Sequence, residues 1–380
     1  MATTCLPHPS VPGNAELDRL ATEAAGPSAA EHFDAELVRE FSARIGAGTL
    51  SPEGNAVPGT VLDPDPGRFV DLPVPGTERH ARALEAGGRA IRRGAVAMVV
   101  LGGGMATRFG GVVKATAEVV DGLSFLELKL AQAAAADGTV PVAVMTGWAT
   151  HEAIREHARD RGLAEPLLFM QDFSLRLRPD GGLFRTKDGA VSPYTTGHGE
   201  LPAALGRSGM LARLRRQGVR VLMVSNVDNL FATPDPAVIG THLLSGRGLS
   251  VEVVCDHEGS GAVVARHAGR MRLFDGSELP GGRGPTRNPA LNTNTFIVDL
   301  DALEHPLGLD WLYFRKEVEG RPAVQMERPL HHLTGTVETS FVRVPWHGPH
   351  SRFLPLKTRT DLERARPRIR ESLPRLLPVG

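Results

Sequence analysis

An unbroken apolar run that ends directly in a cluster of glycines constrains this chain more than any other feature. The run, Val96–Leu101, has the length of one strand, and its lack of polar alternation predicts burial on both faces, as in a parallel sheet. The residues that follow combine backbone freedom with polar and cationic groups: Gly102, Gly103, Gly104, Thr107, Arg108 and Lys114. Backbone N–H groups exposed by glycine, together with cations, suit phosphate oxygens. The pattern indicates a nucleotide site at the carboxyl end of this strand.

The glycine-rich segment does not match either of two common phosphate-binding patterns. The dinucleotide pattern G-x-G-x-x-G, started at Gly102, requires a third glycine where this chain has Thr107. The P-loop pattern requires a Gly-Lys-Ser/Thr triplet, which the sequence lacks. A tight strand-to-loop turn without a ligand is therefore an alternative for this segment taken alone, because glycine-rich turns are common.

Strands and helices alternate along the rest of the chain. Apolar runs predict strands at 96–101, 141–146, 167–170, 219–225, 249–255, 295–300 and 339–344. Helical periodicity predicts helices at 124–136, 150–161, 201–217, 236–245 and 360–370. This alternation predicts an α/β fold with a mostly parallel sheet and helices on both of its faces. Ligands of such sheets bind at the carboxyl ends of the strands.

The N-terminal quarter of the chain differs from this pattern. Its periodicity predicts helices at 14–25, 29–45 and 78–93, separated by a Pro/Gly-rich and extended segment at 51–75. We therefore expect three parts: a helical and Pro-rich extension packed on the core (1–93), the core itself (94–345) and a C-terminal segment (346–380).

Composition excludes several classes of function. The chain has 380 residues and a formal net charge of +0, from 43 basic and 43 acidic residues. Because no extended basic run occurs, nucleic acid is not an expected partner, and because no apolar stretch reaches ~18 residues, no membrane-spanning helix is expected. The N-terminus lacks the pattern of a signal peptide, and two cysteines, Cys5 and Cys255, cannot build a disulfide framework. We therefore expect a cytoplasmic protein.

Lysine is scarce in this chain. Five of the 43 basic residues are lysine and the other 38 are arginine; the lysines are Lys114, Lys129, Lys187, Lys316 and Lys357. Lysine is a compact point charge that suits a single phosphate oxygen, whereas arginine favours a planar fork. A lysine kept beside a glycine-rich segment is therefore a candidate for a required contact to phosphate.

Two polar side chains, Asn226 and Asp228, follow the predicted strand at 219–225. They are two residues apart, so on an extended backbone they point the same way. A carboxylate and an amide offer oxygen ligands of the kind that Mg²⁺ takes together with substrate phosphates. A helix N-cap or Asx turn is the alternative, because Asn and Asp often form these at strand ends.

Three shorter motifs carry polar side chains at expected turns or strand edges. Gly197-His-Gly-Glu200 precedes a helix, and a capped turn with a surface histidine is its alternative reading. Asn292-Thr-Asn-Thr295 opens an apolar strand, and its amides suit sugar hydroxyls, although a polar turn explains it equally well. Val324-Gln-Met-Glu327 alternates, which predicts a half-exposed strand with Gln325 and Glu327 on one face.

A further lysine, Lys357, ends a proline-rich segment that begins at Pro345. We expect a short apolar strand at Phe353–Leu356 that delivers Lys357 beside Arg352. A solvated lysine is the alternative reading. The scarcity of lysine in this chain and the structured run before it favour a functional side chain.

Taken together and in this order, the segments resemble the UDP-glucose pyrophosphorylase family, which includes the UDP-N-acetylhexosamine pyrophosphorylases. The resemblance spans about 96–364 and rests on Leu101–Gly110, Glu118–Glu127, Gly197–Gly199, Asn226–Asn229, Asn292–Asn294, Gln325–Glu327 and Ser351–Leu362. It implies a divergent, short bacterial member with a Rossmann-like (GT-A-like) nucleotidyltransferase core, whose mixed, mostly parallel sheet is flanked by helices. The implied reaction transfers a nucleotidyl group from a nucleoside triphosphate, with UTP favoured, to a sugar 1-phosphate and releases pyrophosphate.

The resemblance also implies roles for individual residues. It implies that three cations stabilise charge on the phosphates during catalysis: Arg108, Lys114 and Lys357. Nucleotide contacts fall to Gly102, Gly103, Gly104, Thr107, Gln171, Gly197 and Asn226. Contacts to the sugar phosphate fall to His198, Asn292, Asn294 and Glu327. Asp228 would hold Mg²⁺, the expected cofactor. The expected assembly is a monomer or small homo-oligomer, without the C-terminal β-helix domain of the glucose-type enzymes.

Four positions depart from the family pattern: Ala106, Val113, Glu200 and Thr295. Three of them lie where base or sugar would be read, while the phosphate-binding cations are kept. An alternative is therefore the same reaction with GTP or ATP on a cyclitol or an unusual sugar 1-phosphate, as in secondary metabolism or antibiotic biosynthesis. A non-catalytic nucleotide-sugar-binding protein is a less favoured alternative, and a nicotinamide oxidoreductase is disfavoured because the dinucleotide pattern fails.

Overall fold

The structure is a computed structural model, and it describes residues 11–104, 109, 112–255, 261–285, 289–304 and 307–377. Three of the residues singled out in the sequence, Ala106, Thr107 and Arg108, lie outside the described residues.

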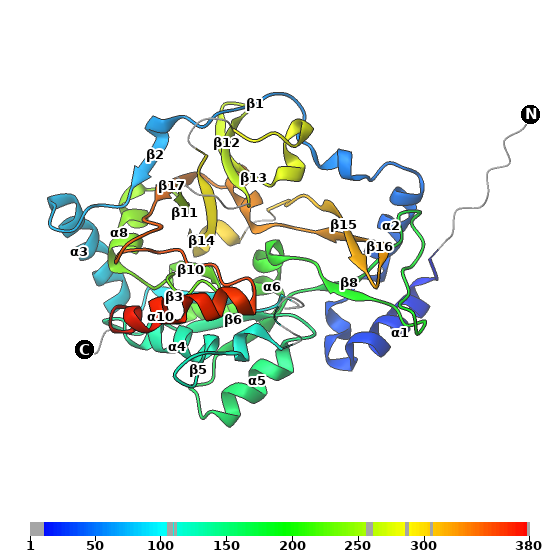
Figure 1. Cartoon of the computed structure of the whole chain (residues 1–380), viewed down its shortest axis with the longest axis horizontal. Helices are drawn as coiled ribbons and strands as arrows, with labels where there is room; N and C mark the ends of the chain where they lie inside the picture. Colours follow the sequence, from blue (N-terminus) through cyan, green and yellow to red (C-terminus); the bar gives the residue numbers. More distant parts are fainter. Residues whose placement is uncertain are drawn as a thin grey trace, which may run out of the picture.

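A twisted central sheet forms the core of the molecule (Figure 1). In spatial order its path runs through β2 (Phe69–Asp71), β17 (Thr339–Arg343), β11 (Leu249–Val254), β14 (Leu291–Asp299), β10 (Val221–Asn226), β3 (Val96–Leu101), β6 (Val142–Thr146) and β7 (Leu167–Met170). Neighbouring strands on this path are parallel, except that β14 runs antiparallel to both β10 and β11. The expectation of a mixed, mostly parallel sheet flanked by helices is confirmed.

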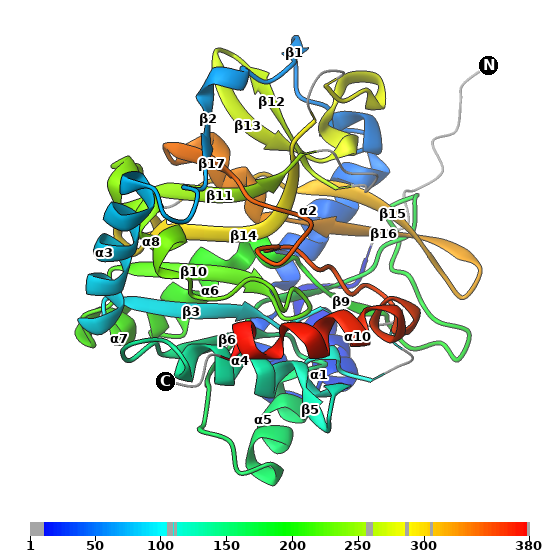
Figure 2. The same ribbon diagram turned by 60° about the vertical axis from the view of Figure 1, so that its left-hand side comes forward.

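Helices cover both faces of this sheet, and β3 shows why its run is apolar throughout. Ala97 and Val99 pack with α6 (Leu201–Arg207) and α7 (Met210–Arg216), whereas Met98 and Val100 belong to the core on the opposite face. The helices that contribute to the second core are α3 (Glu78–Arg92), α4 (Phe125–Ala134), α5 (His151–Asp160), α8 (Pro236–Ser245) and α10 (Arg359–Leu376). Figure 2 shows α10 crossing beside β3 and β6. The prediction of a strand buried on both faces is confirmed.

The N-terminal part of the chain contributes to several layers. Its strand β2 pairs with β17 in the central sheet, and β1 (Val61–Leu62) pairs with β12 (Val263–His267). Helices α1 (Asn14–Ala25) and α2 (Ala35–Gly46) pack against the hairpin of β15 (Leu312–Val318) and β16 (Arg321–Glu327), as Figure 1 shows. The remaining elements are β4 (Glu118–Val120), β5 (Leu123–Ser124), β8 (Phe173–Leu175), β9 (Pro193–Thr195), β13 (Arg270–Phe274) and α9 (Leu333–Thr336). The proposed division at residues 93 and 345 stays a prediction.

Two predicted helices are interrupted. The helix expected at 201–217 is two helices, α6 and α7, because Gly209 adopts a left-handed conformation (φ 69°) between them. The helix expected at 29–45 is wrong in its first part, which forms a 3₁₀ turn at Pro27–His32. Helix α2 begins only after Asp34, whose carboxylate accepts a hydrogen bond from the backbone N–H of Leu37.

The predicted strand at Phe353–Leu356 is also wrong. This segment makes a single β-bridge, between Pro355 and Asn229. Proline has no N–H to donate, and the N–H of Leu354 donates to the Asn229 side chain, so a ladder does not form. Among the helices of the described residues, none is long and apolar enough to cross a membrane.

Candidate active site

Two adjoining chambers open at the carboxyl edge of the sheet. The first, here called the loop chamber, measures about 830 Å³ and is lined by Gly102–Gly104, Lys114 and Gln171 among others. The second, the amide chamber, measures about 400 Å³ and is lined by Asn292, Asn294 and Lys357 among others. Five residues line both chambers: Gly197, His198, Asn226, Asp228 and Glu327. Every described residue that the sequence predicts for the site therefore lies on one of the two walls.

The loop chamber begins where β3 ends in its glycines. A Cβ at Gly103 would lie 1.8 Å from Nε2 of Gln171, so only glycine allows this amide to lie against the loop. The backbone N–H of Gln171 donates to the carbonyl of Thr146 at 2.9 Å, which aligns β7 with β6 at this edge. Oε1 of Gln171 is buried and has no hydrogen-bond partner within the described chain. This acceptor is available to a donor group on a ligand.

Lys114 and Asp228 form an ion pair where the two chambers meet. The Lys114 ammonium lies 2.7 Å from Oδ2 of Asp228 and also donates to the carbonyl of Leu356 at 3.1 Å. Both side chains are mostly buried, with 18% and 16% of their surfaces exposed. Asp228 lies in the turn after β10, so the expectation that an extended backbone aligns it with Asn226 is wrong. The turn nonetheless leaves both side chains on the chamber walls.

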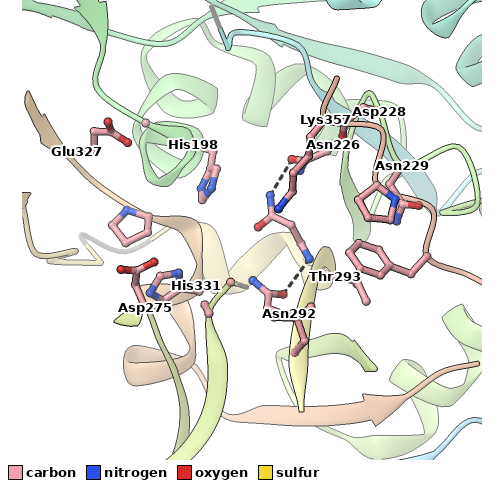
Figure 3. A pocket seen from close by; sticks show the side chains of 18 of the residues that line it. His198, Asn226, Asp228, Asn229, Asp275, Asn292, Thr293, Glu327, His331 and Lys357 are labelled. Atoms are coloured by element: carbon pink, nitrogen blue, oxygen red, sulfur yellow. Dashed lines mark hydrogen bonds between the residues drawn. The ribbon is translucent and has the colours of Figure 1, made fainter. Parts of the chain in front are cut away.

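The amides of the second chamber come from the reversed strand β14. Because β14 runs opposite to β10, its first residues lie at the same edge as the last residues of β10. Asn294 adopts a left-handed conformation (φ 57°) within an irregularity of the β11–β14 ladder. Its side-chain NH₂ donates to Oδ1 of Asn226 at 2.7 Å, and its backbone N–H donates to Oδ1 of Asn292 at 2.9 Å (Figure 3). These bonds fix which polar atoms remain for a ligand.

His198 is a neutral imidazole at the junction of the chambers. Burial above all, with smaller contributions from the nearby His331 and His332, lowers its pKa to about 4. The backbone N–H of Leu330 donates to Nδ1 at 2.8 Å, so the hydrogen resides on Nε2. The alternative of a surface histidine in a capped turn is therefore wrong, and the side chain offers one N–H donor.

Glu327 and Gln325 come from β16 and share one face of it, as the alternation predicts. Both side chains line the loop chamber, and Glu327 also reaches the amide chamber. The expectation of a half-exposed strand is wrong at Gln325, which is buried. Burial raises the pKa of Glu327, while the Lys316 ammonium, 3.6 Å away, opposes the shift.

Lys357 is held at the amide chamber by a buried network rather than by a strand. Arg352 forms an ion pair with Glu252 at 2.7 Å, deep in the core. The Asn229 side chain bonds to both sides of the segment, donating to the carbonyl of Arg352 at 3.3 Å and accepting from the N–H of Leu354 at 3.0 Å. Because Asn229 directly follows Asp228, this network ties the Asp228 turn to the Lys357 segment. Lys357 itself is exposed.

Sequence reasoning missed several side chains on the chamber walls. The amide chamber includes Asp275, Phe314, His331 and Trp346, and the loop chamber includes Arg176, Tyr194 and Lys316. The scarcity of lysine pointed at Lys316 as much as at Lys114. Trp346 lies in the proline-rich segment that begins at Pro345, where the sequence pointed only to Arg352 and Lys357. The other five lie outside the motifs named above, so the sequence offered no signal for them.

Comparison with known proteins places this fold and site in a family. The model of the UTP–glucose-1-phosphate uridylyltransferase family matches residues 80–367, which is most of the chain. The chain belongs to this family. The matched region contains every predicted site residue, from the glycine loop to Lys357.

Relatives of this uridylyltransferase family are distant in sequence. UTP–glucose-1-phosphate uridylyltransferase of Solanum tuberosum is 27% identical over 292 residues, covering 69% of this chain and 59% of the relative. The enzyme of the same name from Musa acuminata is 26% identical over 302 residues, covering 70% and 61%. The chain thus spans about three fifths of the length of these curated relatives.

Solved structures of similar fold come from the same group of enzymes. A UDP-glucose phosphorylase from Trypanosoma brucei superposes with a TM-score of 0.69 at 21% identity, covering 92% of this chain and 79% of that one. A uridine diphosphate N-acetylglucosamine pyrophosphorylase from the same organism, in complex with an inhibitor, gives a TM-score of 0.70 at 17% identity, covering 92% and 78%. At these identities the comparison supports the fold.

Proposed function

We propose that this chain is a sugar-1-phosphate nucleotidylyltransferase that joins a nucleoside monophosphate to a sugar 1-phosphate and releases pyrophosphate. The observation that carries the proposal is the Lys114–Asp228 pair at the junction of two chambers, with Lys357 on the amide chamber directly after Leu356, whose carbonyl accepts a hydrogen bond from Lys114. A reaction between two phosphorylated substrates needs two adjoining pockets and cations where they meet. Family membership supports the same reaction.

In this proposal the nucleoside triphosphate occupies the loop chamber and the acceptor ring occupies the amide chamber. A phosphate oxygen of the acceptor attacks the α-phosphorus in line, and pyrophosphate leaves on the opposite side. Catalysis of this kind depends on positioning and on charge neutralisation. Lys114 and Lys357 both supply positive charge near the junction. Neutral His198 donates its Nε2–H to an oxygen of the acceptor without adding a charge.

The residues present also fit a magnesium ion, which we propose as the cofactor. Asp228 presents a carboxylate to both chambers beside the Lys114 ammonium, and Mg²⁺ is commonly bound by one or two carboxylates plus substrate phosphates. Asp228 would hold the ion, and the ion would neutralise charge on the phosphates. Oδ1 of Asn226 already accepts a hydrogen bond from Asn294, so Asn226 positions the amides rather than the metal.

UTP is the nucleotide we favour, and GTP or ATP with a cyclitol or unusual sugar 1-phosphate is the second candidate. One observation favours the second. Glu200, one of the departures from the family pattern, is buried directly beneath the His198 turn and bonds Arg328, which lines the amide chamber. Glu200 thus holds a cation of the chamber wall, so a change of acid at this position bears on the shape that the chamber presents to the acceptor. We further propose that the enzyme is cytoplasmic, which the scarcity of cysteine supports.

Pyrophosphate release tests the proposal. Purified protein is incubated with Mg²⁺, with UTP, GTP or ATP, and with a panel of 1-phosphates that includes glucose 1-phosphate, N-acetylglucosamine 1-phosphate and cyclitol 1-phosphates. Release that requires both substrates supports the proposed reaction, and its dependence on the base decides between the two candidates. No release with any pair contradicts the proposal.

A further inference from the structure

A buried cluster of one carboxylate and two imidazoles lies behind the wall of the amide chamber. Nε2 of His331 lies 2.7 Å from one oxygen of Glu278, and Nε2 of His332 lies 2.8 Å from the other. The backbone N–H of Asp275 donates to the same carboxylate at 2.8 Å. All three ionisable side chains are buried. The carboxylate therefore receives three hydrogen bonds in a site closed to bulk solvent.

The charge of Glu278 fixes the hydrogens of both rings. Burial alone would raise the pKa of this carboxyl, but the hydrogen bonds from His331 and His332 lower it to about 2. An ionised carboxylate only accepts hydrogen bonds, so Nε2 of each histidine carries a hydrogen. An imidazole that carries its hydrogen on Nε2 presents Nδ1 as an acceptor when the ring is neutral.

The two histidines differ in where their other nitrogen lies. Nδ1 of His332 is enclosed and has no hydrogen-bond partner in the described part of the chain. His331 instead lines the amide chamber, as Asp275 does, and in the view of Figure 3 it lies across from Asn226 and Lys357. No hydrogen bond to Nδ1 of His331 occurs among the described residues, so this acceptor is left for a ligand.

We propose that His331, oriented by Glu278, is a specificity-determining residue whose Nδ1 accepts a hydrogen bond from a hydroxyl or amino group of the acceptor ring. The inference rests on the proposed function and specifies which kind of group on the acceptor ring the enzyme recognises. Asp275 and Glu327 line the same chamber and also accept hydrogen bonds. These acceptors select ring substituents that donate a hydrogen bond.

A metal ion bound by the same three side chains is the competing use of this cluster, and the tautomer argues against it. A metal on Nε2 moves the hydrogen of each ring to Nδ1. In His332 that Nδ1–H would be buried without an acceptor, which costs more than an unused lone pair. The hydrogen-bonded arrangement leaves no buried donor unpaired on either ring.

A matched pair of substitutions tests the proposal. The amide nitrogen of glutamine replaces Nε2 of histidine, so H331Q and H332Q both keep a donor to Glu278 and both lose Nδ1. Only H331Q removes an acceptor from the chamber. We expect H331Q to raise the KM for glucose 1-phosphate about three- to tenfold, the loss of one neutral hydrogen bond, with the KM for UTP unchanged. H332Q leaves both KM values unchanged, and H331N, which keeps an oxygen near the Nδ1 position, restores most of the binding.

The donor on the acceptor is found with 2-, 3-, 4- and 6-deoxyglucose 1-phosphate. For the wild-type enzyme we expect one of these analogues to have a higher KM than glucose 1-phosphate. For H331Q we expect that analogue and glucose 1-phosphate to have the same KM, because the hydrogen bond is already absent. Additive losses for all four analogues, or equal effects of H331Q and H332Q on KM, overturn the inference. Stoichiometric zinc in the purified protein that both substitutions remove equally also overturns it. A wild-type enzyme that releases no pyrophosphate with any acceptor instead overturns the proposed function, and this inference with it.

Discussion

Replacing Lys114 with methionine separates the structural role of the Lys114–Asp228 pair from its role in the reaction. The ammonium and the carboxylate are 2.7 Å apart, and each side chain has less than a fifth of its surface exposed. Breaking a fully buried pair costs about 3–5 kcal/mol, and an exposed pair is worth about 0–1 kcal/mol. For this mostly buried pair we expect K114M to lower the free energy of unfolding by about 1–3 kcal/mol, because it leaves a carboxylate without its partner.

The double variant K114M/D228N distinguishes the two roles. It removes both charges, so it should be more stable than K114M. A double-mutant cycle of K114M, D228N and the double variant in urea unfolding should give a coupling energy between the two side chains of about 1 kcal/mol or more. Activity should behave differently. K114M lowers kcat for pyrophosphate release about 10²–10³-fold, the loss of one group that stabilises developing charge, and the double variant restores none of it. Additive stability changes would refute the ion pair, and full activity in K114M would refute the catalytic role.

Three further predictions test other parts of the molecule. K357M should lower kcat by at least about 10²-fold without changing the melting temperature, because Lys357 is exposed, while the control K187M changes neither. Gly240→Ala should cost about 1–3 kcal/mol in urea unfolding, because its Cβ would lie 1.8 Å from a carbonyl oxygen of α3, while Gly206→Ala, with open space around it, should not. Burial raises the pKa of Glu200 to about 7, although the Arg328 guanidinium acts to lower it. The native state therefore holds this proton more tightly than the unfolded chain does. Unfolding free energy should therefore fall as pH rises from about 4.5 to 7, a decline that E200Q should reduce; an identical pH profile for E200Q would contradict this.

The sequence predicted the parts of the fold that depend on local pattern. The run at Val96–Leu101 indicates a doubly buried strand, and alternate side chains along it pack into two separate cores. The carboxyl-edge rule predicts that the segments holding Gly103 and Asp228 meet at one edge of the sheet, and both residues line the loop chamber. These inferences succeed because the burial of a strand and the order of its residues can be inferred from a short stretch of sequence.

The parts that the sequence did not predict depend on contacts between distant segments. The left-handed conformation of Asn294 and its bond to Asn226 require β14 to be inserted antiparallel, which no local pattern indicates. The Lys357 segment looked like a strand because its residues are apolar, yet a side chain 125 positions away in sequence, Asn229, accepts the N–H of Leu354. Glu278 and His331 are likewise separated by 53 positions and share no motif.

Phosphorus labelling of the nucleotide distinguishes nucleotidyl transfer from phosphoryl transfer and from hydrolysis. With UTP labelled at the α-phosphorus, we expect label to enter a nucleotide sugar only when a sugar 1-phosphate is present. With UTP labelled at the γ-phosphorus, we expect all released label to be pyrophosphate, in equal amount to the nucleotide sugar. Label from the γ-position on the sugar, or released as inorganic phosphate, would contradict nucleotidyl transfer and reveal a kinase or a hydrolase instead.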